Sequence, residues 1–419
     1  MTTVSTADAS AAALVLAAPE ESMALLDGGD RAYPRMLLAI DGARRAVHLE
    51  VYAFSLAGVG TSFVQALAHA AHRGVSVNVV VDGWGSALGG RTVASLLREA
   101  GCRVEIHNPL TALFAGRLGR NHRKILLVDD EVAFVGGINI GEENVGHGTR
   151  QGWADIALEI RGPQCLHLGQ VLRREPRSPV YSALSIHLCG LGGGGRLRRR
   201  YLKAFASAKT RIHVAHGYFL PDSGVVRAIT AAARRGVEVR LLVAGRSDVP
   251  FARAASRSLY RRLLTAGVQI HEWNESVLHA KIATVDGRRL LVGSFNLDPF
   301  SLANLEALVV VDDPTVVQQG ERWIEDHFAR SRVMTSVESS GRVQRWFLDP
   351  LGRWIVRAVD AMSRLMANHD GRRRARLRDT HAKMSHVVRD APPLAANAAA
   401  HERHGARTPD PAPRRERQL

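Results

Sequence analysis

The chain contains one pattern of residues twice in the same register, and this duplication constrains its fold more than any other feature. The pattern is His-x-Lys-x4-Asp, with copies at His122, Lys124 and Asp129 and at His279, Lys281 and Asp286. In each copy a glycine and an asparagine follow, at Gly136 and Asn139 and at Gly293 and Asn296. One copy alone would be weak evidence, but two copies that share five positions indicate a duplicated half-site.

The sequence around the two motifs repeats the same succession of helices and strands. Apolar runs at 47–54 and 75–81 each follow a predicted helix in the first half, and the runs at 212–219 and 237–243 do so in the second. Apolar strands that alternate with helices favour a mostly parallel sheet covered on both faces. The predicted fold class is therefore α/β, with two tandem α/β sandwich domains related by a pseudo-two-fold axis.

The repeat and the composition divide the chain into segments. Residues 190–196 include five glycines and are predicted to be a flexible linker between the domains. The other predicted segments are a disordered N-terminus at 1–21, a first domain at 22–189, a second domain at 197–332, an amphipathic helical extension at 333–369 and a basic, disordered tail at 370–419.

The charge of the chain favours a polyanionic partner. Its 419 residues carry a net charge of +16, from 56 Lys and Arg against 40 Asp and Glu. Nucleic acid and the anionic surface of a membrane both suit this balance. Three widely separated cysteines argue against a disulfide framework and fit a reducing compartment. We expect neither a membrane span nor a secretory signal, because long apolar runs and a basic start are missing.

A helix after Asp349 and Pro350 is predicted to be amphipathic. Its apolar stripe consists of Leu351, Trp354, Ile355, Ala358, Met362 and Leu365, and another face carries Arg353, Arg357 and Arg364. Two alternatives remain open for this helix. It lies either at the interface of an anionic membrane or against its own domain.

The spacing of the motifs suits phosphodiester chemistry. Each motif opens a predicted strand, and side chains at i and i+2 of a strand share a face, so the imidazole and the ammonium can reach one phosphate. Cleavage needs a nucleophile, an acid for the leaving oxygen and positive charge at the phosphoryl oxygens. Two histidines and two lysines supply these groups without a metal or a cofactor. We take His122 as the nucleophile and His279 as the general acid and base.

Further polar residues are expected to complete the site. Two asparagines are predicted to bind the phosphate and two carboxylates to orient the histidines: Asn139, Asn296, Asp155 and Glu306. The carboxylates follow their histidines by 33 and 27 residues and resemble in role the aspartate of a serine triad. Asp129 and Asp286 complete the catalytic motifs, but they lie at the far ends of the strands, where bonding the turn is the more natural role.

These residues resemble the phospholipase D superfamily and, within it, the bacterial cardiolipin synthases of the branch without N-terminal membrane spans. The resemblance covers roughly residues 22 to 330 and rests, besides the motifs, on Glu50 and on segments 33–35, 82–86, 136–139, 161–163, 218–221 and 293–299. The family implies a phosphohistidine intermediate and transfer of a phosphatidyl group from one glycerophospholipid to an alcohol.

We accordingly expect a peripheral protein on the cytoplasmic side of the bacterial cell membrane. Its partner would be an anionic phospholipid membrane, with phosphatidylglycerol and phosphatidylethanolamine as candidate substrates, and nucleic acid is not expected as a partner. Three other functions remain open: a phospholipase D that transfers to water, a metal-independent nuclease of the same superfamily, and a lipid-binding protein without catalysis.

One departure from the family pattern concerns Glu306. The family usually carries Ser-Leu-x-x-Asn-x-Glu after the second motif, whereas residues 301–306 are one residue shorter. Either a β-bulge absorbs the change, or Glu306 is displaced from His279 and activity suffers. We favour the bulge.

Overall fold

The computed structural model describes residues 22–87, 89–108, 119–149, 151–175, 183–248 and 250–335, together with 357, 358 and 361. The predictions for segments 1–21 and 370–419, and most of the prediction for 333–369, lie outside these residues. Within them, no helix combines the length and the apolar character that crossing a bilayer requires.

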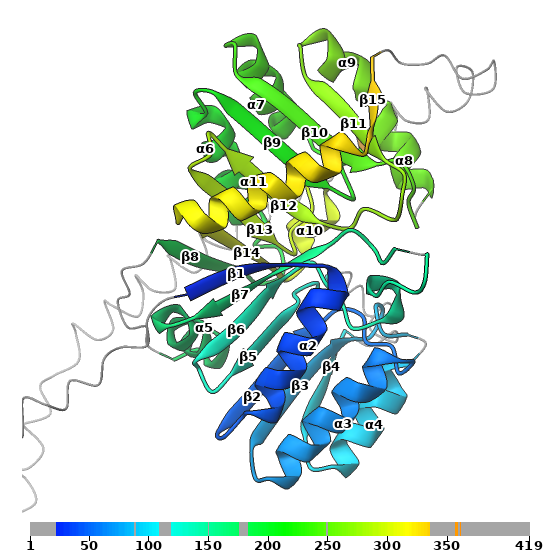
Figure 1. Cartoon of the computed structure of the whole chain (residues 1–419), viewed down its shortest axis with the longest axis vertical. Helices are drawn as coiled ribbons and strands as arrows, with labels where there is room; N and C mark the ends of the chain where they lie inside the picture. The colour runs from blue at the N-terminus through cyan, green and yellow to red at the C-terminus, as the bar shows by residue number, and fades with distance from the viewer. Residues whose placement is uncertain are drawn as a thin grey trace, which may run out of the picture. The chain divides into compact units, whose positions relative to one another are not determined.

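The first half folds into a seven-stranded sheet in the order β1-β7-β6-β5-β2-β3-β4 (Figure 1). Its strands are β1 Ser22–Asp27, β2 Ala46–Val51, β3 Ser76–Asp82, β4 Arg103–His107, β5 Ile125–Val128, β6 Val132–Gly136 and β7 Ile156–Arg161. Strands β2, β3 and β4 are parallel, but β5, β6, β7 and β1 pair antiparallel with their neighbours. The expected mostly parallel sheet is therefore wrong, because β5 and β6 form a hairpin rather than a crossover unit.

The second half repeats this topology in an eight-stranded sheet of order β15-β11-β10-β9-β12-β13-β14-β8. Its strands are β8 Leu184–Cys189, β9 Arg211–His216, β10 Glu238–Ala244, β11 Gln269–Trp273, β12 Lys281–Val285, β13 Arg289–Gly293, β14 Glu306–Val311 and β15 Arg332–Met334. The order β7-β6-β5-β2-β3-β4 of the first sheet corresponds strand by strand to β14-β13-β12-β9-β10-β11 of the second. The α/β class and the internal duplication are both confirmed.

The boundary between the halves differs from the predicted one. The predicted first domain ends at 189 and so includes β8, but β8 pairs antiparallel with β14 of the second sheet. By this pairing β8 covers an edge of β14 that would otherwise be left without a partner. The following glycines are also held in place: Gly192 N donates to Ala303 O at 2.9 Å, and Gly194 N to Leu302 O at 3.3 Å. The segment is thus part of the second domain rather than a loose linker.

Helices pack on the faces of both sheets. The described helices are α2 Gly28–Asp41, α3 Val59–His72, α4 Gly90–Glu99, η3 Glu142–Asn144, α5 Pro163–Arg173, α6 Gly195–Ser207, α7 Ser223–Arg234, α8 Pro250–Arg257, α9 Tyr260–Thr265, α10 Phe300–Ala303 and α11 Pro314–Ala329. One apolar cluster unites α2, α3 and α4 with the first sheet, and another unites α6, α7 and α9 with the second. Gly74 and Gly236, which follow α3 and α7, have φ of +87°, the left-handed backbone that ends these helices.

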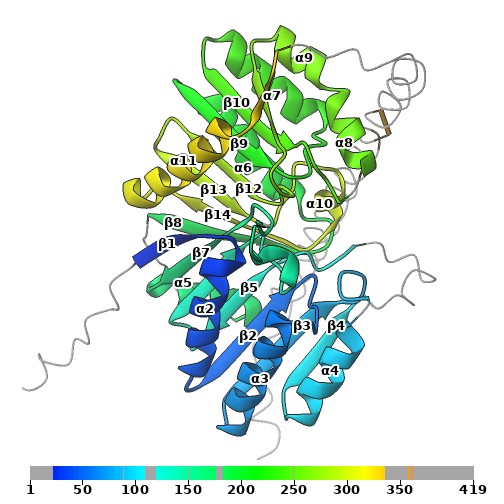
Figure 2. The same cartoon turned by 45° about the vertical axis from the view of Figure 1, so that its right-hand side comes forward.

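A third apolar cluster joins the inner faces of the two sheets. It contains Ile125, Val135 and Leu158 from the first sheet and Ile282, Val292 and Val309 from the second. Helix α11 lies across the second sheet next to β1 in both Figure 1 and Figure 2. There Trp323 Nε1 donates to Asp27 Oδ1 at 2.7 Å, and Leu25 N donates to Gln319 Oε1 at 3.0 Å.

Two backbone bridges tie the halves together reciprocally. Asn121 pairs with Leu305, and Leu278 pairs with Ala154. Asn121 and Leu278 each immediately precede a motif histidine, whereas Ala154 and Leu305 each immediately precede a carboxylate. Such an exchange of equivalent contacts is the mark of two-fold symmetry, and it places both motifs at the junction of the sheets.

Candidate active site

Each motif histidine lies just before a strand, in a segment held by the opposite half. His122 N donates to Leu305 O at 3.0 Å, and Leu305 N donates to Arg120 O at 2.8 Å. His279 N donates to Ala154 O at 2.9 Å. The backbone of each half thus sets the position of the other half's imidazole.

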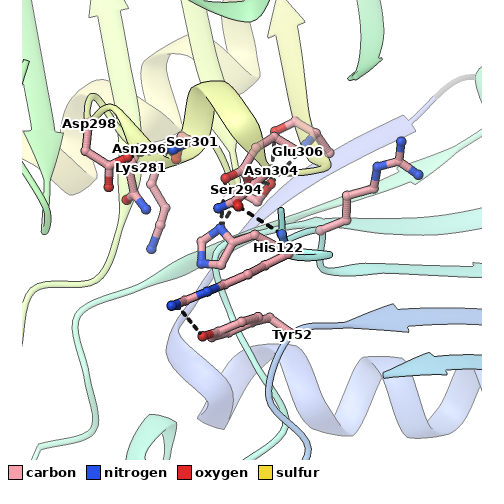
Figure 3. Close-up of polar contacts among 12 residues, drawn as sticks. Tyr52, His122, Lys281, Ser294, Asn296, Asp298, Ser301, Asn304 and Glu306 are labelled. Atoms are coloured by element: carbon pink, nitrogen blue, oxygen red, sulfur yellow. Dashed lines mark hydrogen bonds and ion pairs between the residues drawn. The ribbon is translucent and has the colours of Figure 1, made fainter. Parts of the chain in front are cut away.

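The carboxylates that contact the histidines come from the opposite halves. His122 Nδ1 lies 3.1 Å from both carboxylate oxygens of Glu306. Figure 3 shows the imidazole turned toward this carboxylate. His279 Nδ1 lies 2.6 Å from Asp155 Oδ2. Asp155 and Glu306 do contact the imidazoles, but the expected pairing within each half is wrong. The two bridges explain this result, because they place the residue after Ala154 beside His279 and the residue after Leu305 beside His122.

The shortened segment before Glu306 also differs from expectation. The ladder of β14 with β8 runs without interruption from Glu306 to Val311, and the pairing of β14 with β13 is equally continuous. The favoured bulge is therefore not found in this strand. Glu306 instead turns toward His122 and accepts a hydrogen bond from Ser294 Oγ at 2.5 Å.

The motif lysines lie beside their histidines, and both are buried. Lys124 Nζ donates to His122 O at 2.8 Å, and Lys281 Nζ donates to His279 O. Each ammonium also faces an aromatic ring, with Lys124 Nζ 5.1 Å from the centre of Tyr52 and Lys281 Nζ 5.9 Å from that of Tyr218. Contact with the ring face stabilises a cation.

The same two tyrosines flank the imidazoles. The ring centres of Tyr52 and His122 are 4.9 Å apart, and those of Tyr218 and His279 are 5.8 Å apart. Sequence analysis did not single out either tyrosine for the site. A usable signal existed, because each one closely follows the strand that pairs with the motif strand.

The electrostatics of the two histidines show that the half-sites share one environment. Burial lowers the pKa of His122 well below its ordinary value, and the charges of Lys124 and Lys281 lower it further. Burial and the charge of Lys281 likewise lower the pKa of His279, against the opposing effect of Asp155. Burial also lowers the pKa of Lys281 to about 8. Charges from the second half therefore reach the imidazole of the first.

The two buried carboxylates differ in their proton affinity. Burial raises the pKa of Glu306 to about 8, although Lys124 and the Ser294 hydroxyl oppose this shift. Burial acts on Asp155 in the same direction, but His279 and Lys281 outweigh it and hold the pKa of Asp155 below its ordinary value. At neutral pH, Asp155 is thus the more firmly ionised partner.

The two motif asparagines are buried within the same region. Asn139 Oδ1 accepts from Ala53 N at 3.2 Å, and Asn296 N donates to Ser301 Oγ at 3.1 Å. Asn296 lies next to Lys281 in Figure 3. Their predicted role as phosphate donors stays a prediction.

The motif aspartates Asp129 and Asp286 lie away from the motif histidines and lysines and bind backbone amides. Asp129 accepts from three successive backbone amides at 44–46, each at 2.8 Å. Asp286 accepts from the amides at 209–211, at distances between 2.7 and 3.1 Å. Both have φ of +55° and lie at the far ends of β5 and β12, about 16 Å from the lysines at 3.3 Å per residue. Both side chains fix turns, the role that their position suggested, and their inclusion in the catalytic set stays a prediction.

A buried polar network supports the segment before His122. Asn121 N donates to Asp82 Oδ2 at 2.8 Å, and Asn121 Nδ2 donates to Glu50 Oε2 at 3.1 Å. Arg120 donates to the Tyr52 hydroxyl at 3.0 Å and lies 5.1 Å from the Trp84 ring centre. Sequence analysis missed Arg120, which no motif marks.

Both halves of the chain match one family of known proteins. The family model described as cardiolipin synthase, PLD-like domain, matches residues 36–165 and 201–328. Cardiolipin synthase B of Salmonella typhi is 35% identical over 318 residues, which cover 70% of this chain and 77% of that protein. Cardiolipin synthase 1 of Bacillus anthracis is 30% identical over 345 residues, 75% of this chain and 68% of its own length.

A solved structure has the same fold. Phosphatidylserine synthase from Haemophilus influenzae Rd KW20 superposes with a TM-score of 0.65, over 82% of this chain and 94% of that one. Its sequence identity is 14%, so the likeness concerns the fold. It covers both halves, in agreement with two tandem domains of one kind.

Proposed function

This chain belongs to the cardiolipin synthase family with phospholipase D-like domains and is a phosphatidyltransferase, and we propose that it transfers phosphatidyl groups through a phosphohistidine on His122. Its substrates are phospholipids. The donor is a glycerophospholipid, and the acceptor is an alcohol such as glycerol or the headgroup of phosphatidylglycerol. A donor phosphatidylethanolamine fits the same chemistry.

The observation that carries the proposal is the exchange of carboxylates between the halves. Each imidazole turns Nδ1 toward a buried carboxylate, at 3.1 Å for His122 and 2.6 Å for His279. Nε2 is then the ring atom that remains for the substrate in each half, and the ionised Asp155 stabilises positive charge on the ring of His279. Two such imidazoles with two buried ammonium groups supply every group that phosphoryl transfer needs.

In the first step His122 Nε2 attacks phosphorus. The new P–N bond forms as the P–O bond to the headgroup breaks, and the leaving oxygen takes a proton from His279 Nε2. Lys124 and Lys281 stabilise the charge on the phosphoryl oxygens, with Asn139 and Asn296 as neutral donors. Binding of the anionic phosphate offsets the lysine charges that lower the pKa of His279, which favours its protonated form.

The difference between the carboxylates supports the order of these roles. A nucleophilic imidazole must be neutral, and the pKa of His122 is lowered by burial and two lysines while its partner Glu306 holds its own proton up to about pH 8. A general acid must carry a proton, and the ionised Asp155 at 2.6 Å stabilises that form of His279.

In the second step the acceptor alcohol attacks the phosphohistidine. Its oxygen bonds to phosphorus, the P–N bond to His122 breaks, and the proton of the alcohol passes to His279 Nε2. The net charge of +16 supports reaction at an anionic membrane. We place the protein peripherally on the cytoplasmic side of the bacterial cell membrane.

The test is incubation with defined phospholipids in EDTA, followed by mass analysis of every lipid formed. Phosphatidylglycerol should yield cardiolipin and glycerol, and an acid quench should trap a labelled phosphoenzyme on His122. Phosphatidic acid as sole product would identify a hydrolase. Label on His279 would reverse the assigned roles, and the lack of both label and product would refute the mechanism.

A further inference from the structure

The duplicated halves differ at one position next to the phosphate-binding asparagines. Asn139 and Asn296 are equivalent, since the residues that follow them form the same bridge, Phe54 with Ile140 and Phe219 with Leu297. One residue further, the first half carries Gly141 and the second carries Asp298. Only the second half thus places a carboxylate at this position.

Asp298 is held at the active site rather than in solvent. The backbone N–H of Ser301 donates to Asp298 Oδ1 at 2.7 Å, so the start of α10 fixes the side chain. Figure 3 shows Asp298 beside Asn296 and Lys281. Its charge acts on both Lys281 and Tyr218. Burial raises the pKa of Asp298 to about 6, which leaves it ionised at neutral pH.

The groups around Asp298 also flank His279. The Tyr218 hydroxyl donates to the carboxylate of Asp248 at 2.6 and 2.7 Å, and the Tyr218 ring lies 5.8 Å from that of His279. The centre of the Trp153 ring lies 5.4 Å from the centre of the His279 ring. In the first half, the tyrosine beside His122 is Tyr52, and its hydroxyl pairs with a guanidinium instead, because Arg120 donates to it. The second half therefore offers hydrogen-bond acceptors where the first offers a donor.

The side chain of Asn296 gives independent evidence for a ligand with donor groups. Asn296 is only 4% exposed, and within the part of the chain that the structure describes its Oδ1 has no hydrogen-bond partner. A buried amide oxygen is costly to leave unpaired. The phosphodiester cannot satisfy it, since its oxygens only accept hydrogen bonds. A hydroxyl or ammonium group of the substrate can.

We propose that Asp298 and Asn296 Oδ1, with the Tyr218–Asp248 pair behind them, form the subsite for the alcohol. This subsite takes a small headgroup that carries a second donor, a hydroxyl or an ammonium, next to the reacting oxygen. The inference rests on the proposed function, in which His279 exchanges the proton of that alcohol. Asp298 is a specificity-determining residue: it accepts a hydrogen bond from the second donor group.

The subsite has a chemical consequence for the phosphohistidine. Water and the alcohol compete for it, and in either case the attacking oxygen bonds to phosphorus while its proton passes to His279 and the P–N bond breaks. Water has no second donor group at the distance of Asp298. The carboxylate therefore favours transfer to the alcohol over hydrolysis.

The experiment uses the p-nitrophenyl ester of phosphatidic acid as donor, with glycerol or ethanolamine as acceptor. The p-nitrophenolate leaves without a proton and without a second donor group, so in a single turnover with enzyme in excess its release reports formation of the phosphoenzyme alone. The ratio of transfer product to phosphatidic acid reports the subsite. Asp298→Asn should leave p-nitrophenol release within about threefold of the wild type, since it removes no group from the first step.

The same variant should lower the ratio of transfer to hydrolysis by about tenfold or more, the usual value of a hydrogen bond to a charged group. Asp312→Asn is the matched control, because Asp312 is an exposed carboxylate paired with Arg289 and should leave the ratio unchanged. A normal ratio of transfer to hydrolysis in Asp298→Asn would overturn the inference. A fall in p-nitrophenol release as large as the fall in this ratio would also overturn it, since Asp298 would then act through Lys281. No p-nitrophenol release by the wild type would refute the proposed function instead.

Discussion

The two half-sites place equivalent histidines and lysines in the same arrangement, but different residues surround them. Both histidines turn Nδ1 toward a buried carboxylate, but the pKa of Glu306 is raised to about 8 while that of Asp155 is held below its ordinary value. The first half adds a guanidinium near its histidine, and the second adds Asp298 in place of Gly141. In the proposed mechanism, duplication supplies the symmetric groups that bind a phosphate, and the divergence around them gives the equivalent histidines different roles.

The largest effect should come from separating those roles with an activated donor. His122→Ala removes the nucleophile, so release of p-nitrophenol from the phosphatidic acid ester should fall by at least about 10³-fold. His279→Ala removes only the acid, which this leaving group does not need, and should still release one equivalent in a single turnover. With ordinary phospholipids, His279→Ala should lose about 10²- to 10⁴-fold. Rapid-quench kinetics measure both, and equal losses with the activated donor would mean that the halves act alike.

The next largest effect should be a difference in kcat between variants of the two carboxylates, Asp155 and Glu306. Asp155→Asn removes an ionised partner and leaves the His279 tautomer unfixed, so kcat should fall by about 10²- to 10⁴-fold. Glu306→Gln replaces a carboxyl that already holds a proton up to about pH 8, and we expect a loss of about tenfold. Steady-state kinetics on phosphatidylglycerol give the ratio. A greater loss in Glu306→Gln would reverse the assignment of acid and nucleophile.

The pH dependence of stability should also distinguish the two carboxyls. The pKa of Glu306 is raised from 4.5 in the unfolded chain to about 8, so its contribution is complete below pH 4.5 and is lost as pH rises toward 8. Asp155 has a lowered pKa, so its contribution is present above pH 3.8 and is lost as pH falls.

Thermal melting of the variants measures this difference. Relative to the wild type, Glu306→Gln should gain stability as pH rises from 4.5 to 8, and Asp155→Asn should lose less stability on acidification below 3.8. Each change should amount to a few degrees in Tm, about 2–4 °C per kcal/mol for a domain of 150–250 residues. Parallel curves for the two variants would show that the carboxyls are equivalent.

The smallest effect on catalysis should come from the motif aspartates. Asp129→Ala loses three hydrogen bonds to backbone amides and places alanine at φ of +55°, so it should destabilise the fold by about 2 kcal/mol or more. Asp286→Ala should cost less, because its bonds are more exposed. The kcat of the folded fraction should stay within about twofold of the wild type in both. A large loss of kcat without unfolding would place these aspartates in the catalytic set.

The motifs predicted which histidines and lysines meet at the junction of the sheets, but not which carboxylate contacts which histidine. The repeat of His122 and Lys124 at His279 and Lys281 is local, so spacing alone indicates which lysine lies beside which histidine. The pairing of Glu306 with His122 depends on the bridge between Asn121 and Leu305, a contact across 184 residues that no local pattern encodes. Sequence separation was therefore a poor guide to which carboxylate serves which imidazole.

The sheet direction was mispredicted for a related reason. Strands β5, β6 and β7 are buried on both faces, by the outer helices on one side and by the second sheet on the other. Double burial removes the alternation of polar and apolar residues that usually marks antiparallel strands. Arg120, Tyr52 and Tyr218 lie in loops, where only the assembled fold reveals their neighbours.

The crossing of carboxylates between the halves has an evolutionary consequence. A protein with a single repeat would lack the carboxylate that contacts its imidazole. Two copies of it would have to associate before either imidazole had this partner. In one polypeptide that association is permanent, and the two copies need not be identical. Gly141 and Asp298 therefore occupy equivalent positions in the two halves of one molecule. Such differences between the halves allow one histidine to attack and the other to transfer the proton.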